Sequence, residues 1–174
     1  MLINVARIKN EAQSSMELDI TEQVDAAVCG FPELLLQGPL HFTGRIINAA
    51  PYLQLSGRLS ARLELSCSRC LQPLERSFKV DIAESYTNKP EVAEADDGGE
   101  VILFEGDEID ITPVMLNALF GELPMHPLCR QDCRGLCPEC GADLNRSACT
   151  CQQDNIDIRL EKLRTLWDAM NKEV

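Results

Sequence analysis

Residues 53–67 read LQLSGRLSARLELSC, and apolar side chains alternate with polar ones along the whole stretch. Leucine, alanine or cysteine occupies each odd position apart from Gly57, and a polar or charged residue occupies each even position. Successive side chains of a β-strand point to opposite faces, so this period of two predicts a strand with one apolar face. We expect a half-buried antiparallel strand here, or a pair of strands bent at Gly57.

The segments around this stretch predict the rest of the sheet. Residues 75–86, ERSFKVDIAESY, read as a second strand, and residues 41–48, HFTGRIIN, read as a third. The turn between the first two strands is CSRCLQPL at 67–74, which carries a CxxC pair at its tip. The N-terminal LINVARI is expected to add a further strand.

Two helices are expected in the second half of the chain. Pro113 suits the first position of a helix near 113–122, Thr112 or Asp110 is available as its cap, and Pro124 ends it. A C-terminal amphipathic helix is expected over 156–174. Its apolar stripe, for which core packing is the favoured interpretation over partner binding, comprises Ile156, Leu160, Leu163, Trp167 and Met170.

These elements predict an α+β protein, with a mainly antiparallel sheet or partial barrel, a cysteine-rich zinc module and a C-terminal helix. We expect a β-rich core over 1–125, which includes an acidic loop at 87–110, followed by a zinc-binding module at 126–155. The N-terminus lacks the pattern of a signal peptide, and no apolar run reaches the roughly 20 residues of a membrane helix. A cytoplasmic protein is therefore expected, in which clustered cysteines favour metal binding over disulfides.

Eight of the nine cysteines form four close pairs. The pairs are Cys67 with Cys70, Cys129 with Cys133, Cys137 with Cys140, and Cys149 with Cys151. A structural zinc ion takes four ligands in tetrahedral geometry, so these thiols predict one or two structural zinc ions. Cys29 has no such neighbour and is interpreted as a small buried apolar residue.

The pairing of these cysteines stays open at the level of sequence. Only eight residues separate Cys140 from Cys149, so the last four cysteines are able to close on one ion. The first four would then meet across the fold. A cross-braced arrangement would instead couple 67–70 with 137–140 and 129–133 with 149–151. A single zinc ion with spare thiols is a third arrangement.

No cysteine or histidine motif predicts catalysis. The spacing CxxxCxxC at 133–140 is that of radical S-adenosylmethionine enzymes, but only 34 residues follow it, too few for the barrel which that chemistry needs. Neither His41 nor His126 begins the HxE motif of zinc deaminases. Four thiolates also close the open coordination position that a catalytic zinc ion needs. We therefore expect a protein that is not an enzyme, with His126 in a surface role or a supporting one near the cluster.

The net charge of −12 is unevenly distributed, because residues 81–112 contain eleven acids and one lysine. The preceding strands are rich in basic residues, and the candidate contacts to RNA phosphates are Arg45, Arg58, Arg62, Arg76 and Lys79. An acidic chain argues against a protein that coats nucleic acid without sequence preference. Arg69, Arg130 and Arg134 lie within or beside cysteine pairs, where they would either neutralise thiolates or contact RNA.

The order of the cysteine motifs resembles the YceD family of large ribosomal RNA subunit accumulation proteins. The matching residues are CSRCL (67–71), LP (123–124), CRQDCRGLCPECGADLN (129–145), CTC (149–151) and IDIRLEKL (156–163). The resemblance implies a protein of bacteria or plastids that supports accumulation of large-subunit (23S) ribosomal RNA. The expected function is a non-catalytic ribosome-biogenesis factor that binds precursor ribosomal RNA, a large-subunit ribosomal protein, or both. The alternatives are a zinc-stabilised protein-binding adaptor without RNA contact and an iron–sulfur or thiol redox protein.

Overall fold

The structure is a computed structural model, and it describes residues 1–27, 30, 34–95, 98, 101–151, 163 and 167. The chain divides into two compact units. The sheet unit comprises Met1–Cys67 and Gln72–Cys129, and the cysteine unit comprises Ser68–Leu71 and Arg130–Val174. Cys29 and most of the expected C-terminal helix lie outside the described residues. Within the described ranges, no helix is long and apolar enough to cross a membrane.

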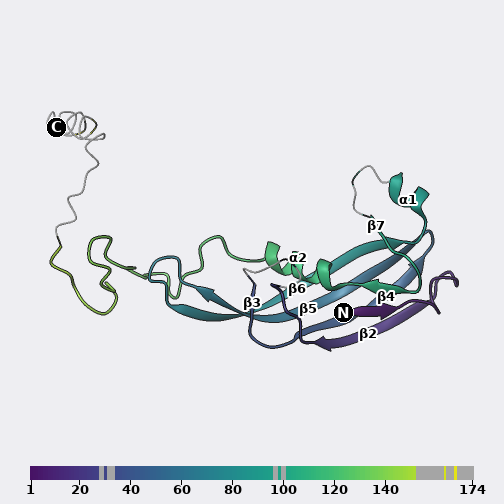
Figure 1. The fold of residues 1–174 in the computed structure, drawn as a ribbon, viewed down its shortest axis with the longest axis horizontal. Coiled ribbons are helices and arrows are strands. Elements are labelled where there is room, and N and C mark those ends of the chain that lie inside the picture. The colour runs from purple at the N-terminus through teal and green to yellow at the C-terminus, as the bar shows by residue number, and fades with distance from the viewer. Residues whose placement is uncertain are drawn as a thin grey trace. The chain divides into compact units, whose positions relative to one another are not determined.

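The sheet unit is built on one curled sheet that forms half a barrel (Figure 1). Its strand order is β2 (Ser15–Glu22), β4 (Leu40–Ala49), β5 (Tyr52–Ser66), β6 (Pro73–Thr87) and β7 (Val101–Leu103). The short β3 (Leu35–Leu36) also pairs with β5. All pairings in this sheet are antiparallel except that of β6 with β7. The expected antiparallel sheet with partial closure is therefore confirmed.

Residues 53–66 lie in one continuous strand, β5, and not in two strands bent at Gly57. Gly57 lies directly opposite Gly44 of β4, and the two backbones approach closely. A Cβ atom at Gly57 would lie 2.5 Å from the Thr43 carbonyl oxygen and 2.6 Å from the Phe42 ring. Glycine at this position therefore lets β4 and β5 pass each other without a break while the Phe42 ring packs over the crossing.

The segment 87–110, expected to be an acidic loop, contains three short elements. They are α1 (Pro90–Glu94), β7, and β8 (Glu108–Asp110), and β8 pairs with β1 (Leu2–Asn4) in a separate two-stranded sheet. The N-terminal strand is therefore shorter than the expected LINVARI. Ile109 of β8 is buried, which explains how a segment rich in acids contributes to the core.

The first predicted helix is present as α2 (Thr112–Gly121), with Pro113 in its first turn. Ile111 is the N-cap residue, so the predicted capping residues are displaced by one position, although an Asp110 carboxylate oxygen accepts a hydrogen bond from the Thr112 N–H at 2.9 Å. Of the C-terminal stripe, only Leu163 and Trp167 are described, and their exposed fractions are 61% and 66%. Core packing is thus not observed for these two side chains.

The core lies on one face of the curled sheet and beneath α2. Apolar residues from β2, β4, β5 and β6 point into it, together with Met115, Leu116 and Leu119 of α2. The opposite face of the sheet carries the polar residues of each alternating strand. Alternation along the strands therefore produces the separation into core and water-facing surfaces.

Candidate metal centres

Two groups of four cysteines have sulfur atoms close enough to hold one metal ion each. The first quartet comprises Cys67, Cys70, Cys129 and Cys133, and the second comprises Cys137, Cys140, Cys149 and Cys151. Within each quartet the four sulfur atoms lie within 4.8 Å of one another. This grouping is the arrangement in which the last four cysteines close on one ion and the first four meet across the fold. It is not the cross-braced arrangement.

Both CxxC pairs adopt the same turn. The backbone N–H of Cys67 donates a hydrogen bond to the Gln72 carbonyl at 2.9 Å, and that of Cys137 donates to the Ala142 carbonyl at 2.8 Å. In each case the partner is the fifth residue along the chain, so the turn folds back on itself and brings its two sulfur atoms together. Because both turns share this hydrogen bond, each CxxC pair presents two sulfur atoms together and supplies half of a quartet.

The residue after each CxxC pair has a left-handed backbone conformation. Its φ angle is +60° at Leu71 and +71° at Gly141. Glycine adopts this conformation at no steric cost, whereas a leucine there is strained by about 1–2 kcal/mol. The glycine in CPECG therefore has a local structural role, and the leucine in CSRCL adopts the same conformation at a higher energetic cost.

Asn145 lies beside the first quartet, and the sequence analysis did not identify it as a site residue. Its side-chain amide nitrogen lies 3.5 Å from the Cys133 sulfur and donates a hydrogen bond to Asp143 at 2.7 Å. Its carbonyl oxygen accepts hydrogen bonds from the Arg134 backbone N–H and the Arg130 guanidinium, at 2.8 and 2.9 Å. These contacts fix the orientation in which Asn145 donates to a sulfur, which is how neighbouring groups stabilise metal-bound thiolates.

The arginines near the cysteines have partners within the cysteine unit. The Arg69 guanidinium donates to the Cys133 carbonyl at 2.7 Å, and the Arg69 carbonyl accepts from the Leu136 N–H at 3.1 Å. Arg130 contacts Asp132 at 3.5 Å in addition to Asn145. The geometry of Arg69 and Arg130 favours the supporting role over RNA contact. His126 is exposed and belongs to neither quartet.

The thiols of the second quartet differ in acidity because of their surroundings. Backbone N–H groups of Cys140 and Glu139 stabilise the Cys137 thiolate and lower its pKa to about 7. A hydrogen bond to Cys140, together with burial and the negative charge of neighbouring thiolates, raises the pKa of Cys151 to about 12. The pKa of Cys149 is raised chiefly by its hydrogen bond to Cys137. Four adjacent thiolates repel one another, and a divalent cation removes that repulsion.

The donor sets fit a structural metal ion. Each quartet supplies four sulfur atoms, which complete a tetrahedral shell and leave no position for water or substrate. Three members of the first quartet are buried, and the second contains one buried and two half-buried cysteines. Both sites are therefore suited to holding local structure in place.

Four of the five candidate RNA-binding residues share the polar face of the sheet. Strand register places Arg45, Arg58, Arg62 and Lys79 on that face, and all four are exposed. Arg76 lies opposite Leu63 on the other face, where its guanidinium donates to the Leu128 carbonyl at 3.0 Å. Arg76 is therefore not part of a common basic surface.

The polar face carries charges of both signs. Arg58 forms an ion pair with Asp81 at 2.7 Å, and the hydrogen bond and charge of Arg58 lower the pKa of Asp81. Glu17 of β2 is the cross-strand neighbour of Arg45. Arg58 and Arg45 thus have acidic neighbours that weaken their attraction for phosphate.

A groove of about 390 Å³ on this face has no carboxylate among the described residues that line it. Arg62 and Lys79 line it together with His41, whose ring nitrogen lies 2.9 Å from Asp19. The remaining lining residues are uncharged. Of the predicted basic residues, Arg62 and Lys79 are therefore the pair best placed to meet an anion.

Comparison with known proteins identifies relatives over most of the chain. A protein 30% identical to this one, over 94% of this chain and 79% of its own length, is an uncharacterized protein of Mycobacterium tuberculosis. YlbN of Bacillus subtilis, also uncharacterized, is 25% identical over 88% of this chain and 89% of its own length. No solved structure matches the chain.

A relative from plants has a name that states a process. The chloroplastic large ribosomal RNA subunit accumulation protein YCED homolog 1 of Arabidopsis thaliana is 23% identical over 95% of this chain and 58% of its own length. The family model of the large ribosomal RNA subunit accumulation protein YceD matches residues 55–167, which contain most of β5, all of β6 and α2, and both cysteine quartets. This chain belongs to the YceD family.

Proposed function

We propose that this chain is a non-catalytic ribosome-biogenesis factor that supports accumulation of large-subunit (23S) ribosomal RNA in the cytoplasm by binding its precursor. The observation that carries this proposal is the family match over residues 55–167, because the family is named for this process. The closed sulfur donor sets support a structural protein over an enzyme.

The two quartets are proposed to hold one structural zinc ion each. Zinc prefers four tetrahedral thiolate ligands, and tight turns that present two thiolates each are typical of such sites. Metal binding of this kind contributes directly to folding, because the ligands are not assembled in the unfolded chain. The ions would thus hold the turns at 67–72 and 137–142 in place.

The groove lined by His41, Arg62 and Lys79 is proposed to contact the RNA backbone. Neither Arg62 nor Lys79 has a salt-bridge partner within the described part of the chain, so both charges are available. The remaining acidic surface would repel RNA, which favours a small defined contact over a broad one.

Replacing both Arg62 and Lys79 by alanine should weaken RNA binding at low salt by about tenfold, because two phosphate contacts are lost. The plot of log affinity against log salt should become shallower by about 1.4, since each single-strand phosphate contact contributes about 0.7. Filter binding of a precursor rRNA fragment across a salt series measures both quantities.

Arg7→Ala is the control for this experiment, because Arg7 is an exposed cation outside the groove. It should leave the salt slope unchanged. An equal loss in the control, or an unchanged slope in the double variant, contradicts the proposed groove. If the unsubstituted protein fails to bind RNA even at low salt, the function becomes that of a protein-binding adaptor, for instance for a large-subunit ribosomal protein.

A further inference from the structure

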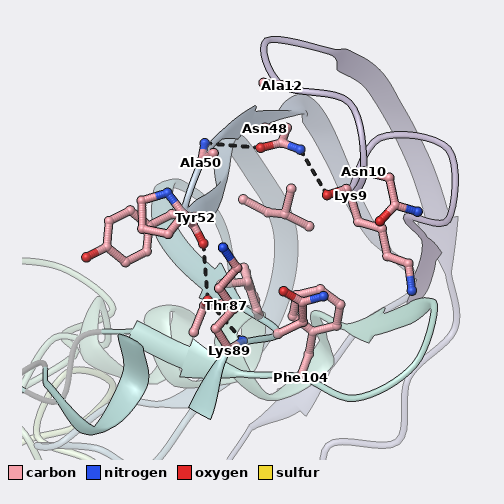
Figure 2. Close-up of a pocket in the computed structure, with 13 residues that line it drawn as sticks. Lys9, Asn10, Ala12, Asn48, Ala50, Tyr52, Thr87, Lys89 and Phe104 are labelled. Atoms are coloured by element: carbon pink, nitrogen blue, oxygen red, sulfur yellow. Dashed lines mark hydrogen bonds between the residues drawn. The ribbon is translucent and has the colours of Figure 1, made fainter. Parts of the chain in front are cut away.

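A recess of about 140 Å³ lies at one end of the curled sheet, within the sheet unit. Four segments meet there: the loop between β1 and β2, the turn between β4 and β5, the end of β6, and residue 104 after β7. Figure 2 shows the labelled residues arranged around it, with Asn48 above, Lys9 and Asn10 to one side, Tyr52 to the other, and Thr87, Lys89 and Phe104 below. An engineered cavity of about 150 Å³ accepts one benzene ring, so the recess has room for a single planar ring.

Part of the lining is a rigid polar frame. The Asn48 side-chain nitrogen donates to the Ile8 carbonyl at 2.7 Å, and its oxygen accepts from the Ala50 N–H at 3.1 Å. The Thr87 hydroxyl donates to the Pro51 carbonyl at 3.1 Å (Figure 2). These bonds tie the turn between β4 and β5 to its neighbours, so the recess is preformed.

Aromatic side chains supply part of the apolar lining. Phe104 is buried, and Tyr52 is half-buried at the start of β5. Tyr86 also lines the recess, and its hydroxyl is buried with no hydrogen-bond partner among the described residues. Aromatic faces of this kind bind the flat rings of unpaired nucleobases by stacking.

Three exposed polar side chains at the rim have no partner among the described residues. No hydrogen bond or ion pair within the described residues engages the Asn10 amide, the Asn88 amide or the Lys89 ammonium group. Lys9 differs, because its ammonium group is bonded to the Gly106 carbonyl and to Asp107. The rim thus offers two amides, each able to donate and accept, and one unneutralised positive charge.

The charge of the lining selects the class of ligand. None of the described residues that line the recess has a carboxylate, although the chain carries a net charge of −12. A cation would find no negative ligand there, whereas an anionic ligand finds Lys89. The combination of a ring-sized space, aromatic faces, amides that match base edges and one cation is that of a site for a nucleotide.

We propose that this recess binds one nucleotide of a single-stranded RNA. The base occupies the space beside Tyr52 and Phe104, the amides of Asn10 and Asn88 meet its polar edge, and Lys89 contacts its phosphate. The proposal rests on the proposed function in taking RNA as the natural ligand. The recess is then a second RNA contact, separate from the groove that contains Arg62 and Lys79. Unlike that groove, it recognises an unpaired base.

The test uses the full chain with its metal ions and the four nucleoside 5′-monophosphates as probes. Protein-observed NMR titrations should show saturable shifts in backbone amides at 9–12, 48–50, 52–53, 86–89 and 104 for at least one nucleotide. The double variant Asn88→Ala/Lys89→Gln should bind that nucleotide about tenfold more weakly, as expected for loss of a base-edge and a phosphate contact. Asn117→Ala is the matched control, because it removes an exposed amide on α2 outside the recess.

Absence of saturable shifts for all four nucleotides overturns the inference, and so do shifts confined to the groove lined by Arg62 and Lys79. Unchanged affinity in the double variant, or an equal loss in Asn117→Ala, also overturns it. The filter-binding experiment with a precursor fragment keeps the two proposals distinct. RNA binding without nucleotide binding at the recess contradicts only this inference. Nucleotide binding at the recess without RNA binding contradicts the proposed function and, with it, RNA as the natural ligand of the recess.

Discussion

Replacing Cys137 and Cys149 together by serine should reduce the zinc content of the purified protein from about two ions per chain to about one. Both residues belong to the second quartet, so only two thiols remain there, while the first quartet keeps all four. Apparent binding free energies of structural zinc sites are about 10–16 kcal/mol near neutral pH, and two thiols retain only a fraction of that. Elemental analysis after gel filtration into metal-free buffer gives the stoichiometry.

Cys29→Ser is the control for this pair, because Cys29 lies outside the four close cysteine pairs of the sequence and should leave both ions in place. Loss of both ions from the double variant would show that the quartets are not independent. Unchanged metal content would show that the second quartet does not bind. The unsubstituted protein, purified without added metal, should also be analysed for iron. If it contains iron and absorbs visible light, the cysteines hold an iron–sulfur cluster and not zinc, which favours the redox alternative.

Replacing Gly57 by alanine should lower the free energy of unfolding by about 3 kcal/mol, at the upper end of the range for overpacked sites. The new Cβ atom would lie 2.5 Å from the Thr43 carbonyl and 2.6 Å from the Gly44 Cα, and both are backbone atoms that move only if the strands separate. Chemical denaturation with both ions retained measures the effect as a shift of the midpoint at constant slope.

Ser60→Ala provides the comparison, because Ser60 lies on the same strand, on the polar face, and already carries a Cβ atom. Its effect should remain within about 0.5 kcal/mol. If Gly57→Ala is as stable as Ser60→Ala, the close approach of the β4 and β5 backbones at Gly44 and Gly57 is contradicted.

The central strands could be predicted from the sequence because long alternation has one physical explanation. Residues 53–67 keep a period of two over fifteen positions, and no helix buries such a pattern on one side. The strand β2 was not predicted although Met16, Leu18 and Ile20 alternate with polar residues, because so short a run competes with many chance patterns. The strand β8 depends on its partner β1, which is distant in sequence, so local pattern does not predict it.

The alternation of side chains along a strand also predicts which face of the sheet each residue occupies, and it could have been applied to Arg76. Phe78, Val80 and Ile82 face the core, and Arg76 has the same parity along β6. Because Arg76 occupies an even-numbered position like these three residues, alternation alone places it on the core face and away from Arg62 and Lys79. The acidic neighbours of Arg45 and Arg58 depend instead on strand register, which the sequence does not specify across separate strands.

The cysteine spacing predicted the halves of the metal sites but left their pairing open. A CxxC turn fixes two sulfur atoms by local geometry, whereas the meeting of two turns depends on the fold between them. Asn145 had no recognisable signal, because its position beside Cys133 arises from the path of the chain between two cysteine pairs. The recess at the end of the sheet likewise combines four segments that no local pattern relates.

Under the proposed function, the chain acts on large-subunit ribosomal RNA by direct contact. Ultraviolet crosslinking of a tagged full-length chain in growing cells, followed by sequencing of the attached RNA, tests it most directly. We expect enrichment of precursor large-subunit rRNA over an untagged control, and loss of that enrichment in Arg62→Ala/Lys79→Ala. Recovery of a ribosomal protein by chemical crosslinking, with no RNA enriched over the control, would contradict it.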